Sequence, residues 1–111
     1  FCSPATGLES FGMVLIEAMA TGKPIVASDI GGYSSVVTHG KQGLLVEPRN
    51  ESALAEALRT LIENPAQRIG MGNEGLNTVE QYRWDRIADR VIAYYDTVLN
   101  RVAARQAIVE I

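Results

Sequence analysis

Cysteine is almost absent from this sequence: Cys2 is the only one among 111 residues. An internal disulfide is therefore excluded, and no cysteine pattern points to an oxidising compartment. A free cysteine is most often a small buried hydrophobe, so we expect Cys2 to lie in the core. We expect the protein to be cytoplasmic.

Long apolar runs and clustered positive charge are also missing. No segment approaches the roughly 20 apolar residues that span a bilayer, and the first four residues lack the charged region that opens a signal peptide. The formal charge is −3, with the ten Lys and Arg spread along the chain. Because a nucleic-acid backbone requires a basic stripe, nucleic acid is not an expected partner.

The composition is that of a folded domain, with 47% hydrophobic and 21% charged residues. Residues 11–20 are helix-length and apolar on nearly all sides, which predicts a buried helix. Gly22, suited to a left-handed cap, and Pro24 mark its end. The continuous apolar runs at 24–29 and 43–48 predict two strands that are covered on both faces.

Helices are expected between and after these strands. A short helix is expected near residues 33–38, and another begins after a cap at Asn50 and ends before Asn64. A helix weakened by three glycines is expected at about 66–81, followed by a long amphipathic helix at 84–102. This alternation predicts an α/β fold, a three-layer Rossmann-like parallel sheet with flanking helices. Ligands of such sheets bind beyond the carboxyl ends of the strands, which directs attention to the segment before the first helix.

Gly12 stands where that helix begins. The first turn of a helix leaves amide hydrogens without partners and carries partial positive charge, and a glycine lets a ligand approach them closely. The amides of Gly12, Met13 and Val14 therefore suit a diphosphate. The alternative is that Gly12 only allows the helix to pack tightly on the sheet.

Glu17 is the only ionisable residue in the apolar segment 11–20. Helical side chains lean toward the N-terminus, so its carboxylate reaches back toward the free amides, where it suits a ribose diol. A structural ion pair, for instance with Arg49, is the alternative. Glu9 precedes the helix and suits a sugar hydroxyl, although it also suits the helix dipole alone.

Residues 9–20, the Gly22-Lys23-Pro24 segment and the Gly31-Gly32 pair resemble the retaining glycosyltransferases of family 4, which have the two-domain GT-B fold. Two Glu separated by seven residues, here Glu9 and Glu17, are the signature of that family. The resemblance continues through residues 43–48, 54–58 and 82–84. Among family members, the phosphatidylinositol mannosyltransferases are the most similar.

The resemblance implies a site for a nucleotide-diphosphate sugar, whose hexose is transferred with retention of configuration and without a metal or other cofactor. Glu9 would be the catalytic residue and would contact hydroxyls of the donor sugar. Glu17 would hold the ribose. The sugar-phosphate would lie against the residues at the helix start: Phe11, Gly12, Met13 and Val14.

The resemblance also implies that residues 1–111 are the donor-binding, C-terminal part of a GT-B enzyme. The expected partners are the nucleotide sugar and an N-terminal acceptor domain that is absent here, through which alone a membrane would be contacted. The chain alone is expected to be inactive. Ser35 departs from the family, whose members usually have an acidic residue at that position.

Three alternatives compete with this interpretation. One is another GT-B sugar-nucleotide enzyme, such as an epimerase, and a second is a degenerate, non-catalytic module. A nicotinamide-binding domain is set aside because no Gly-x-Gly-x-x-Gly follows a strand. Outside the site, we expect His39 in a surface loop, and we expect Trp84, Tyr94 and Tyr95 to serve packing.

Overall fold

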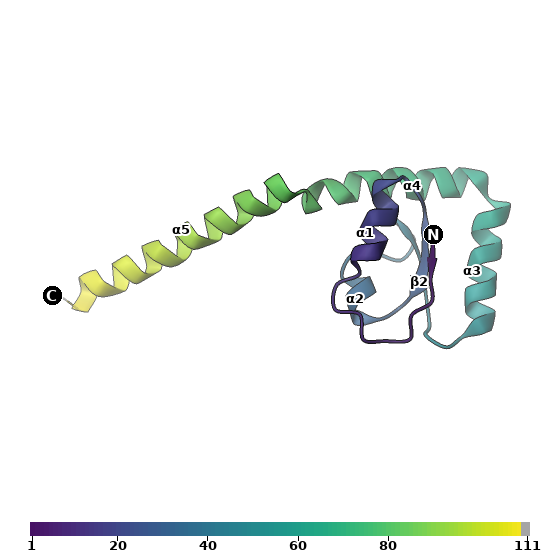
Figure 1. The fold of residues 1–111 in the computed structure, drawn as a ribbon, viewed down its shortest axis with the longest axis horizontal. Helices are drawn as coiled ribbons and strands as arrows, with labels where there is room; N and C mark the ends of the chain where they lie inside the picture. The colour runs from purple at the N-terminus through teal and green to yellow at the C-terminus, as the bar shows by residue number, and fades with distance from the viewer. Residues whose placement is uncertain (110–111) are drawn as a thin grey trace. The chain divides into compact units, whose positions relative to one another are not determined.

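The computed structural model describes residues 1–109, and the chain divides into two units. Unit 1 comprises Phe1–Glu80 and unit 2 begins at Gln81. The two units are described separately below, and Figure 1 shows the elements of each.

Unit 1 is built on a sheet of three parallel strands in the order β1-β2-β3. The strands are β1 (Cys2–Ser3), β2 (Ile25–Ser28) and β3 (Gly43–Val46). All four residues of the central strand β2 are buried, as its continuous apolar run predicts. Because the strands are parallel, their carboxyl ends meet at one edge of the sheet.

Four α-helices and one short 3-10 helix follow or connect these strands. Their bounds are α1 (Met13–Ala20), α2 (Gly31–Ser34), α3 (Glu51–Glu63), α4 (Pro65–Val79) and η1 (Glu80–Tyr82). The predicted caps are confirmed at two helix ends. The Asn50 side chain accepts a hydrogen bond from the Ala53 amide at 2.9 Å, and Gly22 adopts the left-handed conformation after α1.

The core lies on both faces of β2, so the predicted three-layer arrangement is confirmed. Val26 packs with Ala57 and Leu61 of α3 on one face. Side chains alternate along a strand, so Ile25 and Ala27 point to the opposite face, where α1 packs on β2. Figure 1 shows β2 between α1 and α3.

The glycines of α4 have a packing role that their sequence does not reveal. They were expected to weaken the helix, yet α4 is continuous through all three. A Cβ added to Gly72 would overlap the carbonyl oxygen of Gly22, and one added to Gly75 would lie 3.2 Å from the Met19 side chain. Two of the glycines therefore let α4 press directly against the C-terminal end of α1.

Three sequence predictions for unit 1 need correction. The helix α1 is not buried all round: Leu15, Ile16 and Met19 are buried, but its other side is exposed. Cys2 is exposed rather than in the core, because β1 is an edge strand that pairs on one side only. The short helix α2 begins two residues earlier than predicted and contains the glycine pair.

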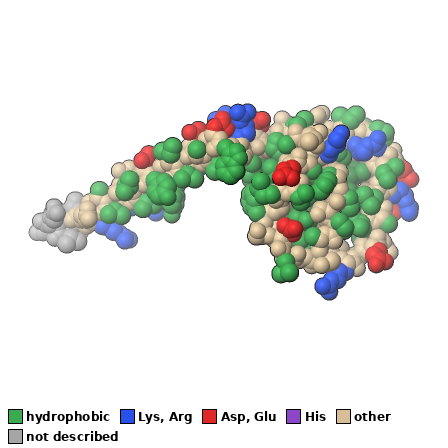
Figure 2. Space-filling view, viewed as in Figure 1, with side chains coloured by type: hydrophobic (Ala, Val, Ile, Leu, Met, Phe, Trp, Pro, Cys, Tyr) green, Lys and Arg blue, Asp and Glu red, His purple; other side chains and the backbone are tan. Residues whose placement is uncertain are grey.

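The described part of unit 2 is dominated by one long helix, α5 (Trp84–Val109). Its amphipathic pattern is confirmed, and Figure 2 shows apolar side chains along its visible face. Trp84, Tyr94 and Tyr95 are exposed, so the prediction that they serve packing is wrong for this unit. The reason is that no strand or second long helix lies within its described residues to cover them.

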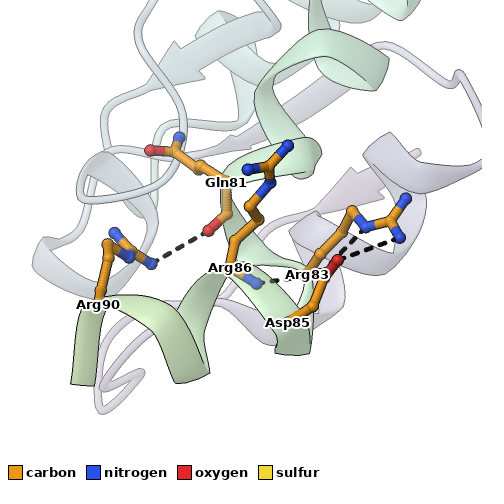
Figure 3. A network of polar contacts seen from close by, with 5 residues as sticks. All are labelled: Gln81, Arg83, Asp85, Arg86 and Arg90. Atoms are coloured by element: carbon orange, nitrogen blue, oxygen red, sulfur yellow. Dashed lines mark hydrogen bonds and ion pairs between the residues drawn. The ribbon is translucent and has the colours of Figure 1, made fainter. Parts of the chain in front are cut away.

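A polar network fixes the start of α5 (Figure 3). Arg83 Nε donates to Asp85 Oδ1 at 3.2 Å, and the Arg86 amide donates to the same oxygen at 3.0 Å. Arg90 donates to the Gln81 carbonyl at 3.0 Å. The hydrogen bond from Arg83, followed by that from the Arg86 amide, lowers the pKa of the Asp85 carboxyl.

We predict that Gly72→Ala destabilises unit 1 by about 1–3 kcal/mol, because the new methyl group overpacks the contact with Gly22. Gly70→Ala is the matched control in the same helix, where a Cβ meets open space. It should be neutral or stabilise by up to about 1 kcal/mol through helix propensity. Urea unfolding followed by circular dichroism measures both, and equal effects of the two substitutions would contradict the packing role.

We also predict that Arg83→Gln raises the pKa of Asp85, measured by an NMR titration of the carboxyl signal. The control Arg86→Gln keeps the backbone amide that contacts Asp85 and should change this pKa less. Folding lowers the pKa of Asp85, so at pH values above the unfolded-state pKa the charged carboxylate stabilises the folded start of α5. That contribution is lost as the pH falls through the lowered value.

Candidate functional site

The loop from Pro4 to Gly12 leaves the carboxyl end of β1 and leads into α1. Three of its residues have positive φ angles that side chains rarely adopt: Gly7 at 152°, Leu8 at 66° and Gly12 at 76°. The Leu8 side chain is fully exposed, so its own packing does not hold it in this conformation. The loop path is therefore imposed by contacts elsewhere.

Gly12 caps α1 in the left-handed conformation and without any side-chain cap. Its carbonyl accepts the first helical hydrogen bond, from the Leu15 amide at 3.0 Å. In the part of the chain that the structure describes, no hydrogen bond is made by the amides of Gly12, Met13 or Val14. Three donors thus remain at the positive end of a helix, where an anion is favoured.

The predicted site residues surround this helix start. Glu9 lies in the loop and Glu17 lies one turn beyond Met13 on the same face of α1, and both are exposed. The sequence indicated that Glu17 lies in a buried helix, and this prediction is wrong. Among the described residues, no ion pair joins Glu17 to Arg49. The remaining predicted residues offer partly exposed apolar surface: Phe11 at 41%, Met13 at 52% and Val14 at 38%.

The loop rests on α2, which sequence reasoning did not include in the site. A Cβ added to Gly32 would overlap the carbonyl oxygen of Glu9. The Tyr33 hydroxyl lies 2.6 Å from Ser3 Oγ, and a Cβ added to Gly12 would lie 3.0 Å from the Tyr33 ring. The Gly-Gly-aromatic sequence directly after a buried strand is the signal that could have indicated this contact.

Ser35 has a local role in α2. Its hydroxyl donates to the Gly32 carbonyl at 2.7 Å, the same oxygen that a Cβ on Gly12 would approach to 3.1 Å. Ser35 therefore satisfies a carbonyl that faces the start of α1. His39 is exposed, as expected, and its Nδ1 accepts a hydrogen bond from the Leu45 amide at 3.0 Å.

A small cavity of about 140 Å³ opens at the same edge of the sheet. It is lined by Thr6, Ser28, Glu47, Arg49 and the start of α3. Its lining includes Pro4 and Thr6 of the loop but not the residues that carry the free amides at the start of α1. Within residues 1–109, no three His, Cys, Asp or Glu side chains gather as a metal site, and no helix is long and apolar enough to cross a membrane.

Residues 1–78 match the family described as "Glycosyl transferases group 1". The chain is 41% identical over 98 residues to a phosphatidyl-myo-inositol mannosyltransferase of Mycobacterium leprae, covering 88% of the chain and 26% of that protein. It is 41% identical over 87 residues to a D-inositol 3-phosphate glycosyltransferase of Corynebacterium urealyticum, covering 78% and 20%. The chain thus spans about a quarter of the length of these relatives.

Solved structures are similar over a comparable part of the chain. A sucrose-phosphate synthase of Thermosynechococcus elongatus matches with a TM-score of 0.73 and 36% identity, covering 82% of the chain and 23% of the synthase. HepE of Anabaena in complex with UDP matches with a TM-score of 0.74 and 31% identity, covering 86% and 27%. A further structure of HepE holds UDP-glucose.

We predict that Gly12→Ala lowers the free energy of unfolding of unit 1 by more than the cost of placing an alanine in the left-handed conformation. Gly40→Ala is the matched control, because Gly40 has a similar φ of 83° but open space around its Cα. The control should cost about 1–2 kcal/mol, and Gly12→Ala about 1–3 kcal/mol more because its methyl group meets Tyr33, Gly32 and Val36. Thermal unfolding compares the two, and equal losses would show that α2 does not support the helix start.

Proposed function

Because the chain belongs to the group 1 glycosyl transferases and its sheet and helices match the GT-B neighbours, we propose that it binds the nucleotide-diphosphate sugar of a retaining hexosyltransferase. In this proposal, residues 1–111 are the donor-binding part of a longer enzyme. An acceptor-binding domain elsewhere in that enzyme completes the active site. The chain alone binds the donor and transfers nothing.

The observation that carries the proposal is the uncapped start of α1. Three amides at a helix start, with no capping side chain hydrogen-bonded to them, offer a diphosphate several hydrogen bonds and the favourable helix dipole. Because Gly12 has no side chain, the start of α1 can lie directly against Tyr33 and Gly32 of α2, which fixes the position of these amides. Such a site also stabilises the leaving diphosphate as the bond to the sugar breaks.

Glu17 supplies recognition of the nucleoside. It is exposed on the same face of α1 as Met13, and its side chain leans toward the helix start. Its carboxylate can accept two hydrogen bonds from the ribose hydroxyls once the diphosphate sits on the amides. Exposure supports this role better than burial would, because the group remains accessible and has no protein partner in the described residues.

Glu9 faces the donor sugar in this proposal and is the catalytic residue, since it contacts hydroxyls of the transferred hexose. Phe11, Met13 and Val14 frame the sugar-phosphate with their backbone and apolar surface. The negative charge of the leaving group is met by the helix start and by basic side chains of the longer enzyme, without a metal. We further propose that this takes place in the cytoplasm.

The comparisons narrow the choice of donor to be tested. One similar structure binds UDP and UDP-glucose, and two similar proteins are named as acting on inositol-containing compounds. We therefore test a uridine diphosphate sugar first as donor, and the direct test is an NMR titration of the chain with UDP and UDP-glucose, with GDP and GDP-mannose for comparison. Binding should shift the amide signals of Gly12, Met13 and Val14 before any others.

We predict that Glu17→Gln weakens binding of the nucleoside diphosphate by about tenfold, because a carboxylate contact to the ribose is replaced by a weaker amide contact. Inorganic pyrophosphate has no ribose, so its affinity should not fall. Glu63→Gln, an exposed glutamate at the end of α3, is the matched control and should leave both affinities unchanged.

Two results would contradict the assignment. An equal loss of pyrophosphate and nucleotide binding would mean that Glu17 acts through the helix rather than on the ribose. Amide shifts confined to the cavity near α3, with none at the start of α1, would place the nucleotide elsewhere at this edge of the sheet.

A further inference from the structure

Tyr33 contacts both ends of the loop that carries Glu9. At the first end, its hydroxyl lies 2.6 Å from the hydroxyl of Ser3, the last residue of β1. At the other end, its ring lies against Gly12, where an added Cβ would be 3.0 Å from Tyr33 Cδ1. One side chain of α2 thus contacts the residues at both ends of the loop, Ser3 and Gly12.

The position of Tyr33 is itself fixed. It is only 1% exposed and belongs to the largest fully buried side chains of the described chain. Its amide donates to the Ile30 carbonyl at 2.9 Å, and its carbonyl accepts from the Val37 amide at 2.9 Å. A buried ring held by its backbone on both sides is a rigid support for a loop with little core of its own.

The middle of the loop meets the neighbouring residue of α2. The carbonyl group of Glu9 lies so close to Gly32 that no side chain would fit there. Just before it, Leu8 holds a left-handed conformation that its exposed side chain does not stabilise. Backbone strain of this kind persists only where surrounding contacts impose it, and the contact of Glu9 with Gly32 of α2 lies directly after Leu8. Figure 1 shows α2 beside the loop that leads into α1.

We propose that Tyr33 is a positioning residue for the sugar end of the donor site. Through its hydrogen bond to Ser3 it fixes the loop that presents Glu9, while its ring supports the helix start at Gly12. This inference rests on the proposed function, because it assigns Glu9 to the sugar and Gly12 to the diphosphate. The two contacts of Tyr33 are therefore expected to serve two different parts of one ligand.

This division makes a distinctive prediction for Tyr33→Phe, which keeps the ring and removes the hydroxyl. Binding of UDP, which depends on the helix start, should stay within twofold of the unchanged chain. Binding of UDP-glucose should weaken roughly 3- to 10-fold, the effect of one lost hydrogen bond. A substitution that merely destabilised the fold would weaken both ligands alike. The same pair of titrations with GDP and GDP-mannose covers a guanosine donor.

Matched variants test the partner of the hydroxyl. Ser3→Ala should reproduce the effect of Tyr33→Phe, and the double variant should be no weaker than either single variant. Ser3→Thr keeps a hydroxyl and should retain UDP-glucose binding. Tyr94→Phe makes the same chemical change at an exposed position of α5 and should alter neither affinity.

A measurement without ligand separates this inference from the proposed function. NMR order parameters of residues 8–11 should fall in Tyr33→Phe and in Ser3→Ala, but not in Tyr94→Phe. If the loop loosens but no nucleotide binds even the unchanged chain, the proposed function fails while the support by Tyr33 stands. If order parameters and UDP-glucose affinity are both unchanged in Tyr33→Phe, the positioning role is wrong.

Discussion

Close approach of one backbone to another is the constraint on which unit 1 depends. At the start of α1, Gly12 lies against the backbone carbonyl of Gly32 and the ring of Tyr33. At the end of the same helix, the carbonyl of Gly22 lies against Gly72 of α4, with no room for a side chain. Helix α1 is therefore held at both ends by contacts in which a glycine removes the bulk that would separate the elements.

This constraint explains how an exposed functional surface can be ordered. The side of α1 that carries Met13 and Glu17 is open, and only the side with Leu15, Ile16 and Met19 packs inward. Burial of these side chains determines only which face of α1 points toward the core. The glycine contacts at its two ends fix its position along its axis, so that its free amides stand at a defined place on the carboxyl edge of the sheet.

The loop before α1 is likewise held by close contacts with another element. It contains few buried side chains, and its conformation includes left-handed residues that cost free energy. Its path depends on two adjacent residues of α2. Gly32 leaves room for the carbonyl group of Glu9, and Tyr33 contacts the loop with its ring and its hydroxyl. A site for a flexible, many-hydroxyl ligand benefits from such support, because a preorganised loop loses less entropy when the ligand binds.

The sequence by itself determined the order of elements, the parallel sheet and the helix start at Gly12, because strand β2, the cap at Asn50 and the left-handed Gly22 follow from local patterns. Only the tertiary structure decided which sides are covered. It left Cys2 and Glu17 exposed, and it gave the glycines of α4 a packing role. Periodicity reports how apolar a segment is, but not which neighbour covers it or how closely two backbones approach, and these depend on contacts between residues far apart in the chain.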